Sequence, residues 1–169
     1  MTTNAMEPTM EQTSVAPVQK SVTVKAGAER AFQVFTQGID SWWPRTHHIG
    51  KSPMTKAIIE GRAGGRCYSE QADGTECDWG QVLEWEPPRR FVLAWQITHE
   101  WGYEPDLAKA SEVEVRFTPV AEGSTRVEVE HRHFERHGAG GVAMKTAVDA
   151  PGGWGTILEL FAAVVAQGE

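Results

Sequence analysis

The sequence has little cysteine, no long apolar run and no excess of basic residues, and each shortage excludes a class of protein. Two cysteines in 169 residues cannot build the disulfide framework of a small secreted domain. No apolar run approaches the roughly 20 residues that span a bilayer. Acidic residues outnumber Lys and Arg by 23 to 16, which gives a net charge of -7. A general binder of nucleic acid or anionic membranes needs a basic face and is therefore not expected.

The first 17 residues also lack the features of a targeting segment. They contain no apolar core and no basic residue before it, so a signal peptide is not expected, and the composition is typical of a disordered tail. We expect residues 18–169 to form a single domain, in a cytoplasmic protein without membrane insertion. Cys67 and Cys77 flank a predicted hairpin and are interpreted as reduced packing residues, with a redox pair as the alternative.

The N-terminal part of the domain predicts one strand and then two helices. Val18, Val22 and Val24 alternate with polar residues, as in a strand with one buried face. Apolar residues then recur at helical spacing from Ala28 to Phe35, and Gly38 ends this amphipathic helix. A short second helix follows and ends before Pro44, because the residue before proline disfavours helical geometry.

Residues 55–134 predict about six antiparallel strands. Turn signals separate them, among them Ala72-Asp73-Gly74 and the Pro87-Pro88 pair. In "SEVEVRFTP", apolar and charged residues alternate, which is typical of a strand with one covered face and one face toward water. The period changes in "GWGTILELFAAVVA", where the apolar stripe predicts a long helix that can lie across the covered face. The preceding "GVAMKTAVDA" is interpreted as an earlier helical piece or a mobile segment.

This order of elements resembles the SRPBCC (START-like, birch-pollen-allergen-like) superfamily, over roughly residues 18 to 167. Within it, the chain is similar to the family of homologues of the activator of heat-shock-protein-90 ATPase. The resemblance rests on "AERAFQVFTQGIDSWWP", "GQVLEWEPPRRFVLAW", "VEVEHRHF" and "GGWGTILELF". It implies an α+β helix-grip fold. In that fold a curved antiparallel sheet of six to seven strands wraps around the long C-terminal helix, with two short helices after the first strand and a cavity inside.

Two histidines in the last predicted strand are the first candidate site. In "RVEVEHRHF", His131 and His133 share a face with Val127 and Val129, and four charged residues occupy the other face. Both imidazoles are therefore expected on the covered side, where they can orient a ligand or transfer a proton. The alternatives are that they only bond to neighbouring polar groups, or that His133 lies at an open rim. A metal site would need a third ligand, and no spacing unites one with them, so no metal is expected.

Aromatic side chains are the second candidate site. Alternation places Trp79, Leu83 and Trp85 on one face of their strand, and Phe91, Leu93, Trp95 and Ile97 on one face of the next. Seven tryptophans exceed what a small core needs, and ligand pockets are mostly apolar and aromatic. Core filling is favoured for Trp85 and Trp154, although Trp154 is also counted as a candidate lining residue. The candidate ligand-binding residues are Trp42, Trp43, Tyr68, Trp79, Trp95, Trp101, His131, His133, Trp154 and Leu158.

The segment "GIDSWWPRTHHIG", residues 38–50, is interpreted as a lid or entrance wall beside the cavity. Trp42 and Trp43 are consecutive, so one is expected to pack inward while the other turns toward the opening. Arg45, His47 and His48 are expected on the outward loop, where they can meet the anionic end of a ligand. A corner packed with aromatics is the alternative.

Three functions remain open from the sequence. The first is binding of a small hydrophobic or amphipathic molecule without a cofactor, and the second is a cyclase, hydrolase or dehydratase that uses His131 or His133. The third is a chaperone-interacting or stress-response protein, or a homodimer, that acts through a surface patch such as outward Val82, Val92 and Ala94. The co-chaperone that gives the family its name has a further large domain upstream, for which residues 1–17 are too short. The first function is the expected one, and an enzyme is the less favoured interpretation.

Overall fold

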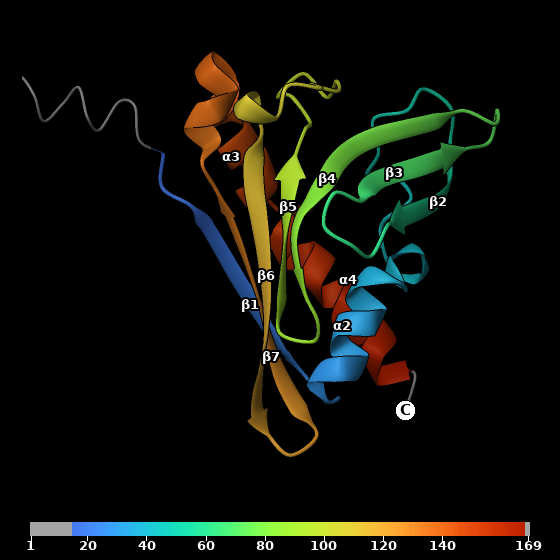
Figure 1. Ribbon diagram of the computed structural model, residues 1–169, viewed down its shortest axis with the longest axis vertical. Helices are drawn as coiled ribbons and strands as arrows, with labels where there is room; N and C mark the ends of the chain where they lie inside the picture. The colour runs from blue at the N-terminus through green and yellow to red at the C-terminus, as the bar shows by residue number, and fades with distance from the viewer. Residues whose placement is uncertain (1–14, 168–169) are drawn as a thin grey trace, which may run out of the picture.

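Seven strands form a single antiparallel sheet in the computed structural model, which describes residues 15–167 (Figure 1). In chain order the strands are β1 (Val18–Val24), β2 (Met54–Ile59), β3 (Arg66–Gln71), β4 (Glu76–Glu86), β5 (Arg90–Trp95), β6 (Ser111–Ala121) and β7 (Ser124–Arg132). Their order across the sheet is β1-β7-β6-β5-β4-β3-β2, so the first strand pairs with the last. The sheet curls, and the helices lie on its concave side.

Two short helical segments connect β1 to β2. Helix α2 (Ala28–Thr36) buries Ala31, Phe32 and Phe35, the stripe that the helical spacing predicts. The second segment, η1 (Ile39–Ser41), is a single 3-10 turn rather than an α-helix. Trp42 and Trp43 follow it directly, and both are buried.

The C-terminal helix α4 (Trp154–Gln167) fills the concave side of the sheet. Its buried residues Trp154, Ile157, Leu158, Phe161 and Val165 are members of the predicted apolar stripe. Helix α3 (Gly141–Asp149) precedes it after the 3-10 segment η3 (Phe134–Gly140), and η2 (Leu107–Lys109) precedes β6. The segment "GVAMKTAVDA" is therefore mostly helix α3, one of the two interpretations left open.

The turn between α3 and α4 is very tight. A Cβ atom on Gly153 would lie 2.1 Å from the carbonyl oxygen of Val148, and Gly152 has a φ of +92°. Glycine has no Cβ to clash at this close approach, and it adopts a positive φ without steric cost. The pair therefore fixes the corner at which α3 and α4 meet.

A bulge in β4 changes the predicted faces of this strand. The register of β4 with β5 shifts between Val82 and Glu84, which leaves Leu83 as the extra residue. Because a shift of one residue exchanges the two faces of a strand, Val82 points into the core and is 1% exposed, while Leu83 is half-buried. The prediction that Leu83 faces the core and Val82 faces outward is wrong for this reason.

The outer face of the sheet does not expose the predicted apolar patch. Val92 and Ala94 are 1% and 2% exposed. Val92 lies between Glu84 and Glu114 in the register of the neighbouring strands, and Arg90 forms ion pairs with both carboxylates. The long charged side chains therefore cover the small apolar ones, and the patch proposed for a partner surface is absent from the described residues.

The predicted order of strand, helices, strands and terminal helix is confirmed, and the architecture is an α+β helix-grip fold. The predicted disordered tail, residues 1–17, lies mostly outside the described residues, and Val15 packs against the core. None of the helices in residues 15–167 has both the length and the apolar character needed to cross a membrane.

Candidate ligand-binding cavity

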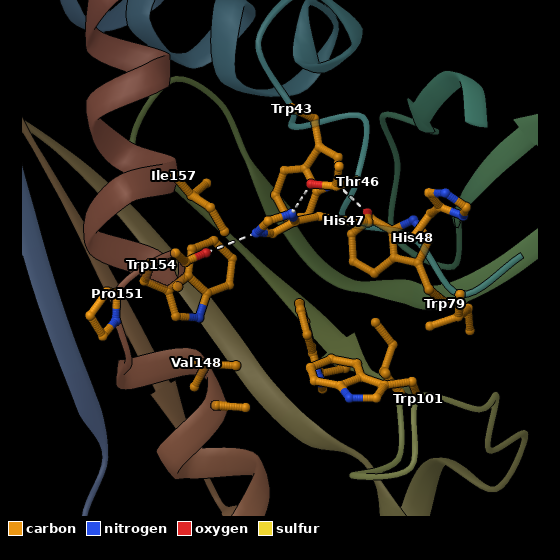
Figure 2. A pocket seen from close by; sticks show the side chains of 16 residues that line it. Trp43, Thr46, His47, His48, Trp79, Trp101, Val148, Pro151, Trp154 and Ile157 are labelled. Atoms are coloured by element: carbon orange, nitrogen blue, oxygen red, sulfur yellow. Dashed lines mark hydrogen bonds between the residues drawn. The ribbon is translucent and has the colours of Figure 1, made fainter. Parts of the chain in front are cut away.

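A cavity of about 470 Å³ lies between the sheet, the α3–α4 corner and the segment after η1. Figure 2 shows Trp154, Val148 and Pro151 on one side of it and Trp79 and Trp101 on the other, with Trp43 and His47 along a third. Its volume falls in the usual range for sites that bind small molecules. The further lining residues are Thr46, His48, Ile49, Trp95, Ile97, Ala147, Gly152, Gly153 and Ile157.

Four tryptophans form a closed circuit of ring contacts in the cavity wall. The indoles of Trp43 and Trp79 are nearly parallel, with their centroids 6.0 Å apart. Trp79 contacts Trp95 at 5.8 Å, and Trp95 contacts Trp154 at 5.9 Å. The circuit closes between Trp154 and Trp43 at 6.2 Å. Because each ring contacts two others, the four rings form a rigid aromatic surface, although they come from four separate parts of the chain.

Hydrogen bonds tie the segment after Trp43 across the cavity to the α3–α4 corner. The Trp43 indole N–H donates to the carbonyl oxygen of His47 at 2.8 Å. His47 Nε2 lies 2.8 Å from the carbonyl oxygen of Gly152, and it must donate because a carbonyl only accepts. His47 Nδ1 is then free to accept from the hydroxyl of Thr46, 3.0 Å away. The polar groups that line the cavity through side chains are thus concentrated in residues 46–48.

Arg45 does not join this polar edge. Its guanidinium donates to Asp40 Oδ1 at 2.8 Å, and the same oxygen accepts from the backbone N–H of Ala57. Burial would raise the pKa of Asp40, but these hydrogen bonds outweigh it, so the pKa is lowered. Asp40 therefore links η1 to β2 and pairs with Arg45, and the expectation that Arg45 meets the anionic end of a ligand has no support in its position.

His131 lies behind the cavity wall and is fully buried. The indole N–H of Trp154, which can only donate, points at His131 Nδ1 at 3.1 Å. Nε2 must then carry the imidazole hydrogen and donate to Ser111 Oγ, 2.8 Å away. The Ser111 hydroxyl is left to donate to His137 Nε2, at 2.8 Å. His131 is thus held neutral by its partners and does not itself line the cavity.

The protonation of the two histidines agrees with this arrangement. Burial, and secondarily the nearby His137, lowers the pKa of His131 well below its ordinary value. Burial and the nearby His99 lower the pKa of His137 as well. The predicted inward orientation of His131 is therefore realised as a satisfied buried hydrogen-bond group, which is one of the alternatives left open.

The predicted inward orientation of His133 is wrong. Strand β7 ends at Arg132, and His133 has a left-handed backbone with φ 65° and ψ 38°. The alternation of side chains stops with the strand, so its imidazole lies partly exposed beside Glu135, at 3.3 Å. No group of three metal-ligating side chains occurs in the part of the chain that the structure describes.

Three other predicted site residues lie away from the cavity. Trp42 packs in the core against Phe35 and Phe161, and its indole N–H donates to the carbonyl oxygen of Val34. Leu158 directly follows the lining residue Ile157 on α4, but it is buried and does not itself line the cavity. Tyr68 lies on the outer face of β3, where its ring stacks under the guanidinium of Arg66. Alternation along β3 explains this, because the buried residues are Cys67, Ser69 and Gln71.

The structure brings together five predicted residues, Trp43, Trp79, Trp95, Trp101 and Trp154. Sequence reasoning missed the contribution of the α3–α4 corner, with Val148, Pro151 and Gly152. The signal was present, because the Pro151-Gly152-Gly153 run marks a sharp turn before an apolar helix. Its distance of about one hundred residues from Trp43 in the sequence concealed the contact. Cys67 and Cys77 are not cross-strand partners, since Cys67 pairs with Gly80 and Cys77 with Ser69.

The curled sheet, the C-terminal helix and the cavity between them define an SRPBCC-type helix-grip protein, a ligand-binding fold. The family described as activator of Hsp90 ATPase homolog 1-like protein matches residues 25–166, and this chain belongs to that family. No curated protein sequence matches the chain.

Solved structures with the same fold carry different names. An anthrahydroquino-gamma-pyrone synthase, Txn09, solved in complex with a compound named SUM, is 41% identical over 90% of this chain and 98% of its own, with a TM-score of 0.64. The self-sacrificing resistance protein CalC from Micromonospora echinospora is 28% identical over 90% of this chain and 96% of its own, with a TM-score of 0.63. Protein NE0264 from Nitrosomonas europaea is 15% identical, with a TM-score of 0.64 over 91% of this chain and 96% of its own, a likeness of fold alone.

Proposed function

We propose that this protein binds a small, planar aromatic molecule in the tryptophan-lined cavity. The observation that carries the proposal is the closed circuit of Trp43, Trp79, Trp95 and Trp154. Indole faces and edges are suited to the offset and edge-to-face contacts that aromatic rings prefer. The polar groups of Thr46, His47 and His48 lie at one edge of the cavity, so an oxygenated end of the ligand would lie there. The similarity to a synthase named for an anthrahydroquino-pyrone supports this ligand class.

The test is a titration with 1,8-dihydroxyanthraquinone as the probe, followed by quenching of tryptophan fluorescence and by the shift in Tm. We expect saturable binding, and a rise in Tm that grows with probe concentration because only the folded state has the cavity. Laurate, an amphiphile without rings, should give a far smaller shift. A probe that leaves both signals unchanged would contradict the proposal.

Two leucine substitutions separate the cavity from the core. Trp79→Leu removes a ring of the circuit, and we expect it to weaken probe binding by about tenfold or more, which corresponds to the loss of aromatic contacts. Trp85→Leu is the matched control, because Trp85 is a half-buried ring of the same strand that packs on Phe32 and lies outside the cavity. Equal affinity losses in both variants would place the binding site elsewhere.

A second candidate is an enzyme that closes or rearranges rings in such a molecule. The 41% identity to a synthase over 90% of the chain favours it. His47 and His48 are then the candidates for proton transfer, since both line the cavity whereas His131 lies behind Trp154. The compound released from freshly purified protein would be incubated with the protein and followed by liquid chromatography and mass spectrometry. Conversion would indicate the enzyme, and recovery of the unchanged compound would indicate a binding protein.

A further inference from the structure

Trp101 differs from the other six tryptophans in its packing. Each of those six makes a ring contact with another aromatic side chain. Trp101 has no such contact within residues 15–167, and it is 52% exposed although it lines the cavity. About half of this large, mainly apolar side chain thus faces water at the cavity edge, so the free protein forgoes the free energy that its full burial would give.

The backbone conformation of Trp101 carries a steric cost. Its φ of 65° lies in the left-handed region, which L residues other than glycine, asparagine and aspartate rarely occupy. The turn that holds it is well bonded: the Thr98 hydroxyl accepts from the Gly102 N–H at 3.0 Å, and the Trp101 N–H donates to the Thr98 carbonyl at 2.8 Å. Glycine at this position would relieve the strain, so the indole itself must account for its presence. Strained residues of this kind cluster at ligand clamps.

The position of the indole indicates what it contacts. A β-bridge between Ile97 and Tyr103 closes the base of the turn and connects it to β5, which also carries Trp95. Figure 2 shows the Trp101 ring across the cavity from Trp154 and Val148. The strained turn therefore presents an unpartnered ring face opposite the α3–α4 side of the aromatic wall.

We propose that Trp101 is the outer clamp of the cavity and stacks on the face of a fused-ring aromatic ligand, which it sandwiches against the α3–α4 wall. This inference rests on the proposed binding of a planar aromatic molecule and narrows the ligand to systems with at least two fused rings. Such a molecule extends from the tryptophan circuit to Trp101, whereas a single ring fills only one of the two positions. Stacking against the ligand offsets the exposure and the strain that the free protein carries.

The test compares Trp101→Gly with His133→Gly as a matched control. His133 has the same φ of 65° but lies outside the cavity, so both substitutions relieve backbone strain. We expect neither variant to melt below the wild type by more than a few degrees. Trp101→Gly should weaken binding of 1,8-dihydroxyanthraquinone by about tenfold, the usual size of one lost stacking contact. His133→Gly should leave the affinity unchanged, and Trp101→Phe should retain most of it.

The outcomes distinguish the proposed role of Trp101 from the proposed binding of a planar aromatic molecule. A wild type that fails to bind the probe would overturn both. Tight binding by the wild type with equal affinity in Trp101→Gly would overturn only the clamp. The size of the probe gives an independent check: the loss in Trp101→Gly should be large for the three-ring probe and small for phenol. Equal losses for both probes would contradict the fused-ring assignment.

Discussion

At the scale of single residues, the indole of Trp154 decides the protonation of His131. An indole N–H only donates, so His131 Nδ1 must accept, and a protonated imidazole would break this bond. The imidazole is also fully buried, where an uncompensated charge is costly. Because Trp154 also lines the cavity, the neutral state of His131 helps to fix the shape of the cavity.

The first prediction concerns the pH dependence of stability. Burial lowers the pKa of His131 in the folded state well below its ordinary value of about 6.5, so the unfolded chain takes up a proton first as the pH falls. Stability should therefore decrease below about pH 6.5, with a slope of up to about 1.4 kcal/mol per pH unit for this one group. His131→Asn keeps an acceptor for Trp154 and does not titrate. Urea unfolding between pH 7.5 and 5 should show a shallower slope for the variant.

Above pH 7.5 the imidazole is neutral in both states, so variant and wild type should show parallel profiles there. His137 contributes a slope of the same sign in both proteins, since burial lowers its pKa too. Identical slopes between pH 7.5 and 5 would show that His131 takes up its proton equally well in the folded protein.

At the scale of elements, the alternation of inward and outward side chains fails wherever the regular pairing of the strands is interrupted. The period of two predicted the buried faces of β6 and β7 correctly up to Arg132, and it misplaced His133 because the strand ends before it. It also misplaced Leu83 and Val82, because the register of β4 shifts against both of its neighbours, β3 and β5, before the strand reaches Trp85. A bulge has no signal of its own in "GQVLEWE", since its position depends on pairing with β5.

Helix α4 provides the second prediction, because one of its faces closes the core. Phe161 is 0% exposed and contacts the rings of Phe35 and Trp42. Phe161→Ala should lower the free energy of unfolding by about 3–5 kcal/mol, the usual cost of removing a buried ring. Leu160→Ala is the matched control at the neighbouring position, where the side chain is 39% exposed. It should cost no more than about 1 kcal/mol.

Chemical denaturation with a common m-value would measure both variants. If Leu160→Ala costs as much as Phe161→Ala, the outward face of α4 is covered by something other than solvent. That result would require a partner on this face, and the oligomeric state would then be measured.

At the scale of the whole molecule, the sequence predicts the fold better than the cavity. Helical and strand periods are local, so the order of elements and the stripe on α4 can be read without knowing any contact. The cavity depends on contacts between distant segments, such as Trp43 with Trp154 and His47 with Gly152. Trp42 and Trp43 illustrate this limit, because the pattern placed one inward and one at the opening without deciding which. Tertiary packing decides it: Trp42 lies in the core and Trp43 in the cavity wall.

The outer face of the sheet is held together by one buried carboxylate. Glu114 on β6 has a side chain only 7% exposed and forms ion pairs with Arg90 on β5, Arg116 on β6 and Arg132 on β7. Burial alone would raise its pKa, but hydrogen bonds from Arg132 and Arg90, with the charge of Arg116, lower the pKa to about 2. The network therefore joins the three neighbouring strands β5, β6 and β7 on the side away from α4.

The third prediction follows from this lowered pKa. A carboxylate with a lower pKa in the folded state stabilises the protein fully above its unfolded value near 4.5, and the contribution is lost as the pH falls toward about 2. Glu114→Gln should therefore cost about 3 kcal/mol near pH 7, since it leaves three guanidinium groups without their shared partner. The difference in stability from the wild type should narrow below pH 4.5.

Glu128→Gln is the matched control. Glu128 lies on β7, on the same face of the sheet as Glu114, and it has no ion pair in the described residues, so this substitution should change stability by no more than about 0.5 kcal/mol. A constant difference between wild type and Glu114→Gln from pH 7 to pH 2 would mean that the shape of the side chain, rather than its charge, joins the strands.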